Sequence, residues 1–246
     1  MALDASSEHD ALDNSEPVPD PVDSGPGKKF DAQGQAQRFP GNTVICPISP
    51  DNPSFAVLHA AYERLYQEVA SDRLAKLPAS SFHMTVFDGA LDARRRPGDW
   101  PHGLPLDASM QACNRHVADA LRKTAITVKT PIRVKIDPAE VSGVPTLVYL
   151  KPLDAQEEQR LRRLREQLTT ATGIRHDNAE SYRFHTSFAY YIHPFDRAGL
   201  KVYQGAYQRM VKQLSRTLAV LELGDPGFCL FDDMLAFRTQ FALGRH

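Results

Sequence analysis

Runs of apolar residues with two different spacings divide the chain into short strands and longer helices. Short β-branched or aromatic runs bounded by Pro, Gly or Asp predict strands, whereas apolar positions three and four residues apart predict amphipathic helices. Strands are expected at residues 43–46, 81–87, 126–136 (interrupted by Pro131), 146–150, 182–190, 228–231 and 234–241. Helices are expected at residues 54–69, 110–121, 154–172 and 200–221. The pair Asp88-Gly89 is expected to end the second strand.

The order of these elements repeats. Each half consists of a strand, a helix, a strand that contains a histidine, a second helix and a further strand. His83 follows Thr43 by 40 residues, and His185 follows Thr146 by 39 residues. An offset of about 102 residues between the halves indicates an internal duplication. The alternative is an ordinary α+β domain whose halves are alike by chance.

Composition places the chain among soluble globular proteins, with 42% apolar and 24% charged residues. No apolar run approaches the roughly 20 residues that a membrane helix needs. We expect no secretory signal, because the N-terminus has no basic stretch followed by an apolar one. The three cysteines are far apart and form no CxxC pair. A disulfide framework or cysteine-zinc site is therefore not expected, and the cysteine pattern favours a cytoplasmic location.

Charge is distributed unevenly. Residues 1–27 carry seven acidic and no basic side chains, together with many Ser, Pro and Gly residues. We expect a disordered acidic tail over residues 1–29, because such a composition cannot bury enough apolar surface. The remaining chain, residues 30–246, is expected to form one domain with lobe one at about 40–140 and lobe two at about 141–246. Its mildly basic charge suits a phosphate-bearing ligand but not a large nucleic-acid footprint.

The two histidine strands carry the chemistry. Because alternate side chains of a strand share a face, His83 and Thr85 lie opposite the apolar residues between them. In the second strand Arg183, His185 and Ser187 share the corresponding face. Either histidine alone could instead be a half-buried side chain bonded to a backbone carbonyl. The matched pair favours a functional site.

Two histidines across a cleft can act together as acid and base. A neutral imidazole accepts a proton from water or a hydroxyl, and a protonated one gives a proton to the leaving oxygen. The paired hydroxyls can donate hydrogen bonds to phosphate oxygens. This combination fits phosphodiester cleavage without a metal. The other histidines form no metal-ligand pattern, and the glycines form neither a P-loop nor a dinucleotide fingerprint, so no cofactor is expected.

The segments FHMTVF at 82–87 and FHTSF at 184–188 resemble the two His-x-Thr/Ser motifs of the 2H phosphoesterase superfamily. That superfamily includes cyclic phosphodiesterases and 2′-5′ RNA ligase-like proteins. Residues 82–89 also resemble an uncharacterised bacterial and fungal branch of it. The resemblance covers residues 40–240. It implies a duplicated α+β fold of two lobes, with antiparallel sheets facing a central cleft and helices packed outside. It also implies metal-free hydrolysis or transfer at 2′,3′-cyclic or related phosphoesters.

By this resemblance His83 and His185 are the catalytic acid–base pair, and Thr85 and Ser187 hold the phosphate. Which histidine is the base is left open. Arg183 is a further candidate for phosphate binding, or else forms a surface salt bridge.

The arginine-rich loop at 94–101 contains Trp100, the only tryptophan. Trp100 could stack on a nucleobase in the manner of single-strand binding sites. The alternative is a solvated charged loop with one packed indole.

The sequence therefore predicts a metal-independent phosphodiesterase that acts on a 2′,3′-cyclic phosphate or a related nucleotide or RNA-end phosphoester. The alternative is a nucleotide- or RNA-binding module with little or no turnover, and a purely structural role is a third reading. No membrane and no stable protein partner are implied.

Overall fold

Two four-stranded antiparallel sheets form the centre of the molecule in the computed structural model, which describes residues 22–69, 71–139 and 143–244. The strands are β1 (Gly41–Pro47), β2 (Leu74–Lys76), β3 (His83–Leu91), β4 (Ile132–Ile136), β5 (Leu147–Pro152), β6 (His185–Ser187), β7 (Ala189–Tyr191), β8 (Leu221–Leu223), β9 (Gly227–Phe231) and β10 (Arg238–Ala242). The helices are α1 (Phe55–Glu68), α2 (Met110–Lys123), α3 (Ala155–Thr172) and α4 (Arg197–Thr217), with short 3-10 turns at Ser71–Arg73 and Ala79–Ser81.

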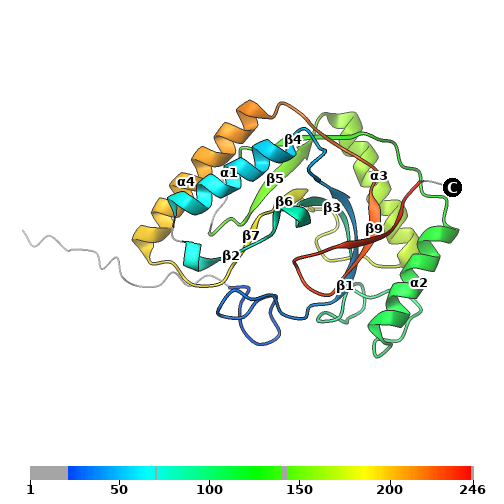
Figure 1. The fold of residues 1–246 in the computed structure, drawn as a ribbon. Coiled ribbons are helices and arrows are strands. Elements are labelled where there is room, and N and C mark those ends of the chain that lie inside the picture. Colours follow the sequence, from blue (N-terminus) through cyan, green and yellow to red (C-terminus); the bar gives the residue numbers. More distant parts are fainter. Residues whose placement is uncertain (1–21, 70, 140–142, 245–246) are drawn as a thin grey trace, which may run out of the picture.

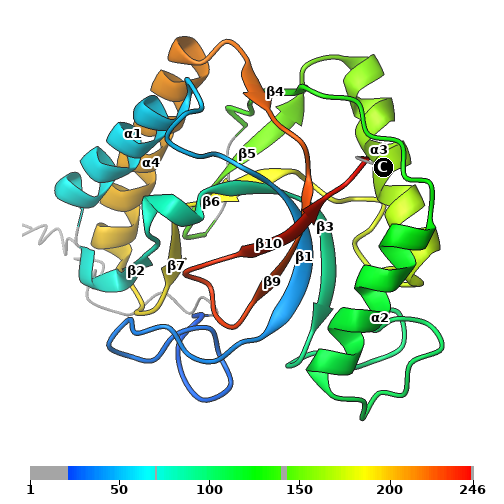
Figure 2. The same cartoon turned by 45° about the vertical axis from the view of Figure 1, so that its right-hand side comes forward.

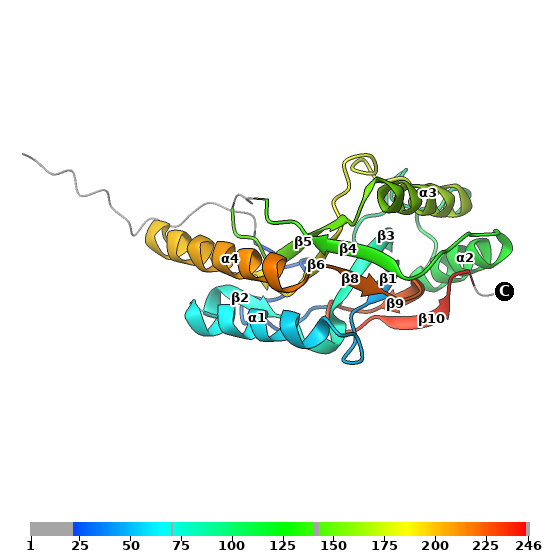
Figure 3. The ribbon, with the colours of Figure 1, turned by 90° about the horizontal axis from the view of Figure 1, so that it is seen from above.

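The helices flank the sheets in pairs. Helix α1 lies beside α4 on one side of the molecule, and α2 lies beside α3 on the other (Figures 1 and 2). The view from above shows the sheets between these pairs (Figure 3). The predicted fold of antiparallel sheets with helices outside is confirmed. In the part of the chain that the structure describes, every helix is too short or too polar to span a lipid bilayer.

Both large sheets place their histidine strand at one end, beside the first strand of the same half of the chain. One runs β3-β1-β9-β10 and the other β6-β5-β4-β8, with a histidine strand at the end of each. The lobes are nevertheless not continuous halves of the chain. Strand β4 precedes residue 140 but pairs with β5 and β8, and the C-terminal strands β9 and β10 complete the sheet of β1. The expected division at residue 140 is therefore wrong, because alternation within a strand does not reveal which sheet the strand joins.

Several element boundaries differ from expectation. Residues 126–131 lie outside β4, and residues 221–223 form β8 rather than the end of α4. The expected strand at 182–190 is two short strands, because β6 pairs with β5 whereas β7 pairs with β2. Phe188 lies between these two strands and bonds toward both of their partners. Its amide donates to the carbonyl of Thr146, and its own carbonyl accepts from the amide of Leu77.

The structured body begins earlier than the composition suggests. The Asp23 amide donates to the carbonyl of Tyr191, and the Ser24 hydroxyl donates to that of Ile192. Phe30 is 1% exposed and packs in a small second core. The expected tail is thus corrected for residues 22–29, because one buried aromatic ring anchors this polar segment. Residues 1–21 of that tail lie outside the described residues.

A bulge in β3 changes which side chains face the histidine side of the sheet. Ile45 pairs with Thr85, and the residue before it, Val44, pairs with Phe87. Val86 of β3 therefore has no partner residue on β1. Val86 and Phe87 are consequently both buried, and Asp88 returns to the side of His83. Bulges commonly redirect side chains in this way beside functional sites. Strand β3 also continues through Asp88-Gly89, where the sequence predicted its end.

Gly89 is required by a close backbone approach. A Cβ atom at this position would lie 2.1 Å from the Oδ1 atom of Asn42 and 2.3 Å from its carbonyl oxygen. Asn42 is 1% exposed, and its Oδ1 accepts a hydrogen bond of 3.0 Å from the amide of Ala90. The buried amide side chain and the missing Cβ together fix the path of the strand after the bulge.

Replacing Gly89 with alanine should therefore destabilise the protein. We expect Gly89→Ala to lower the free energy of unfolding by about 1–3 kcal/mol, the usual cost of overpacking. Thermal unfolding followed by circular dichroism measures the change. The control is Gly224→Ala, because a Cβ there meets no atom within 4 Å. Equal losses of Tm in the two variants would contradict the close packing at Gly89.

Candidate active site

One cavity of about 410 Å³ contains both histidine motifs. It lies where the edge strands β3 and β6 contact each other. His83 and Thr85 line it from β3, and His185 and Ser187 line it from β6. The structure thus brings together the four residues that the two His-x-Thr/Ser motifs single out.

The two histidines are held by equivalent hydrogen bonds. Nδ1 of His83 lies 2.6 Å from the carbonyl oxygen of Ser81, and Nδ1 of His185 lies 3.0 Å from that of Arg183. In both cases the acceptor is the backbone two residues earlier. A carbonyl oxygen can only accept, so each Nδ1 carries a hydrogen and donates it. Each Nε2 is therefore left for acid–base chemistry in the cavity.

The surroundings of the histidines differ. The ring of His83 lies 4.4 Å from that of Phe237, between centroids. Burial lowers the pKa of His83 to about 4, and the charge of His185 contributes to this, whereas the bond to Ser81 and the charge of Asp88 oppose it. His83 is consequently neutral near pH 7. His185 is partly exposed, with the rings of Tyr149 and Tyr182 at 6.3 and 6.1 Å.

Asp88 is a site residue that simple alternation misses. It lines the same cavity because the bulge restores it to the face of His83. Its carbonyl accepts a hydrogen bond of 2.9 Å from Nε2 of His176. Strict alternation from His83 would turn Asp88 toward the core. The only sequence signal against that is the consecutive apolar pair Val86-Phe87 followed by Asp88.

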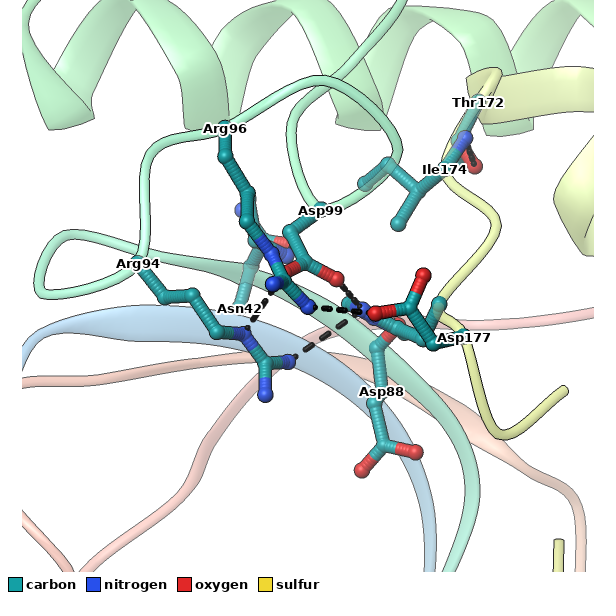
Figure 4. A network of polar contacts seen from close by, with 10 residues as sticks. Asn42, Asp88, Arg94, Arg96, Asp99, Thr172, Ile174 and Asp177 are labelled. Carbon is teal, nitrogen blue, oxygen red and sulfur yellow. Dashed lines mark hydrogen bonds and ion pairs between the residues drawn. The ribbon is translucent and has the colours of Figure 1, made fainter.

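The loop after β3 forms a charged wall of the cavity. Arg94 and Arg96 line it and both bond to Oδ2 of Asp99, with Nε of Arg94 at 3.1 Å (Figure 4). The other oxygen of Asp99 bonds to Nδ1 of His176, and Arg96 also donates to Asp177 at 2.8 Å. His176 and Asp177 follow α3, so this network fastens the loop of one half of the chain to the other half.

Asp99 is only 2% exposed. Burial alone would raise the pKa of its carboxyl. The hydrogen bonds from His176 and Arg96 and the charge of Arg94 outweigh burial and hold that pKa below its usual value. Asp99 is therefore an ionised carboxylate beneath the arginines.

Trp100 does not face the cavity. It is 2% exposed, its Nε1 donates to the carbonyl of Pro105 at 3.1 Å, and the guanidinium of Arg95 stacks 4.5 Å from its ring. The prediction that Trp100 stacks on a base is wrong, because packing and its own hydrogen bond hold the indole inside the loop.

Arg183 also lies outside the cavity lining. Its guanidinium stacks 3.5 Å from the centre of the Tyr149 ring and donates to Asp137 at 3.2 Å. Alternation does not extend to Arg183, because β6 begins only at His185. The salt-bridge alternative therefore describes Arg183, and its assignment to phosphate binding is corrected.

Over the described ranges, no three His, Cys, Asp or Glu side chains are grouped so that they could hold a metal ion.

The electrostatics of His83 can be tested directly. A ¹H–¹³C NMR titration of its ring should show a pKa near 4. Asp88→Asn should lower this pKa further by removing a nearby negative charge, and His185→Ala should raise it by removing a nearby positive one. Shifts in the same direction, or none, would contradict the described proximity of these groups.

Comparisons with known proteins show which family model and which solved structures this chain resembles. Residues 29–144, which include β3 and the arginine loop, match the family model described as 2H-phosphodiest, a domain of unknown function (DUF1868). A crystal structure of the conserved protein of unknown function ATU0111 from Agrobacterium tumefaciens str. C58 has a TM-score of 0.79 and 26% identity. That similarity covers 88% of this chain and 90% of the other.

A second solved structure, that of a phosphoesterase, is much more distant, with a TM-score of 0.47 and 10% identity over 85% of this chain and 99% of the other. No curated protein matches the chain in sequence. The family match falls on the half of the chain that supplies the first motif, and that motif shares its cavity with the second. Through residues 29–144, this part of the chain is assigned to the 2H phosphoesterase superfamily, which supports a phosphoester hydrolase at the level of the family.

Proposed function

We propose that this protein is a metal-independent phosphodiesterase that opens a 2′,3′-cyclic phosphate or a related nucleotide or RNA-end phosphoester. The observation that carries the proposal is the equivalent placement of His83 and His185. Both hold Nδ1 on a backbone carbonyl and share one cavity with a hydroxyl side chain from the same strand. The family supports phosphoester hydrolysis, and the pair of histidines supplies an acid and a base without a metal.

The unequal surroundings of the two rings suggest their roles. His83 is the proposed base, because its low pKa keeps Nε2 unprotonated at neutral pH. It takes a proton from water while the water oxygen forms a bond to phosphorus. The bond between phosphorus and one ribose oxygen breaks, and that oxygen receives a proton from Nε2 of protonated His185. The product is a phosphomonoester beside a free hydroxyl.

Thr85 and Ser187 are proposed to bind the two non-bridging phosphate oxygens. Each lies two residues after its histidine and lines the same cavity. Hydroxyl groups held in place before the reaction can stabilise the charge that develops on these oxygens. The carboxylate of Asp88, on the same side, can accept a hydrogen bond from a hydroxyl or amino group of the substrate.

Substitution of either histidine tests the mechanism. With nucleoside 2′,3′-cyclic phosphates and excess EDTA, we expect His83→Ala and His185→Ala each to lower kcat by about 10²–10⁴-fold, the usual contribution of general acid–base catalysis. His116→Ala is the matched control, because His116 is on α2 and outside the cavity lining. Loss of wild-type turnover in EDTA would contradict the metal-free mechanism. Binding of these nucleotides without any turnover would favour the binding module.

The pH dependence of kcat/KM tests the assignment of roles. Because the base must be neutral, the rate should fall at acid pH only as His83 becomes protonated, near pH 4. It should also fall at alkaline pH as the acid loses its proton. Asp88→Asn should move the acid limb to lower pH. A rate that still rises through pH 9 would count against a histidine acid.

A further inference from the structure

Two cations reach the cavity from segments outside the strand-and-helix pattern that the halves share. Lys29 belongs to the segment before β1, and Arg94 belongs to the loop between β3 and α2. Both line the cavity that contains His83 and His185. These cations therefore add a feature to the cavity that the paired histidine motifs do not supply.

Lys29 is held at the cavity wall by its neighbours. Phe30, the next residue, is 1% exposed in the small second core and fixes the backbone. The ammonium of Lys29 lies 4.3 Å from the centre of the Tyr190 ring and 3.6 Å from the carboxylate of Asp23. Its charge is therefore placed by one buried anchor and by an aromatic ring that lines the same cavity.

Arg94 is held in place by buried polar side chains. Its Nε is bonded to Asp99 at 3.1 Å, and Asp99 in turn accepts a hydrogen bond from Nδ1 of His176. Asp99 and His176 are 2% and 7% exposed, so the supporting groups are buried, while the side chain of Arg94 is 44% exposed. A buried polar support beneath an exposed cation is an arrangement that fixes a ligand-binding group.

The two cations affect one another. Burial lowers the pKa of Lys29, its ion pair with Asp23 opposes this, and the charge of Arg94 lowers it again. Each of the two cations has one carboxylate partner, Asp23 for Lys29 and Asp99 for Arg94. Asp99 is buried beneath the arginines, Asp177 pairs with Arg96, and Asp88 belongs to the histidine strand. An anion between Lys29 and Arg94 would relieve the repulsion.

We propose that Lys29 and Arg94 form a second anion subsite, which binds a phosphate group carried elsewhere on the substrate whose scissile phosphoester lies between the histidines. This inference rests on the proposed function and specifies the substrate further, as a cyclic phosphate with an additional phosphate. A volume of 410 Å³ lies within the usual range of about 300–1,000 Å³ for small-molecule sites.

The test compares ligands that differ only in the second phosphate. Adenosine 2′-phosphate and adenosine 2′,5′-bisphosphate, together with their 3′ counterparts, are titrated into the full-length protein by calorimetry. We expect the wild type to bind the bisphosphate at least about tenfold more tightly, since hydrogen bonds to charged groups contribute about 1.5–3 kcal/mol. Lys29→Gln and Arg94→Gln should each remove most of this difference.

Matched variants separate the subsite from general charge effects. Lys28→Gln removes an equal charge from an exposed neighbour that does not line the cavity, and it should keep the tenfold difference. Lys29→Arg should keep most of it. Failure of the wild type to prefer the bisphosphate, or the same preference in Lys29→Gln as in wild type, would overturn the subsite.

The readout is binding, so it does not depend on turnover. The variant His83→Ala/His185→Ala should retain the preference for the bisphosphate although it cannot hydrolyse a cyclic phosphate. If the proposed hydrolysis fails but the preference for the bisphosphate depends on Lys29, the subsite stands without the reaction. If hydrolysis occurs without such a preference, the reaction stands and the subsite is wrong.

Discussion

The geometry of the site depends on how the outer edge of β3 is satisfied. Strands β3 and β6 are the end strands of their sheets, and they contact each other without forming a strand pair. Side chains of other elements instead donate hydrogen bonds to carbonyl oxygens along this edge of β3. Arg165 of α3 donates to the carbonyl of Val86 at 2.6 Å, and the hydroxyl of Tyr182 lies 3.4 Å from that of Thr85. The guanidinium of Arg165 also stacks 3.7 Å from the centre of the Tyr182 ring. This capping satisfies carbonyl groups at a sheet edge that would otherwise be free to pair with another strand.

The placement of both histidine strands depends on the whole chain, because β4 lies in the sheet of β5 and β6 whereas β9 and β10 lie in the sheet of β1 and β3. Each sheet contains strands from both halves, so neither half completes a sheet alone. The loop network around Asp99 adds a second connection, since it joins residues after β3 to residues after α3. The two histidines are therefore positioned by one continuous core rather than by two hinged lobes. This arrangement suits a reaction in which acid and base must be placed together to within a fraction of an ångström.

Much of this site could be predicted from the sequence, because alternation within a short strand is a local property. His83 and Thr85 precede the bulge, and His185 and Ser187 lie within one strand, so their faces follow from spacing alone. Asp88 could not be placed, since the bulge between it and His83 depends on how β3 pairs with the partner strand β1. The positions of Trp100 and Lys29 were equally hidden. Each is set by burial against distant parts of the chain, and charge or aromatic character does not indicate which groups a loop buries.

The duplicated core and the added segments contribute different properties. The core gives both histidines the same bond from Nδ1 to the backbone, which is what the shared strand pattern can supply twice. The difference between them arises from what packs around each ring. Phe237 of the C-terminal hairpin covers His83, whereas His185 lies nearer to Tyr149 and Tyr182. Because covering the ring disfavours its charged form, an unequal cover can divide the work of acid and base between two similar groups. The N-terminal segment and the arginine loop then add Lys29 and Arg94 to the walls of the cavity. Under the two proposals, the repeated part of the fold supplies the reaction type, and the segments that are not repeated supply the choice of substrate.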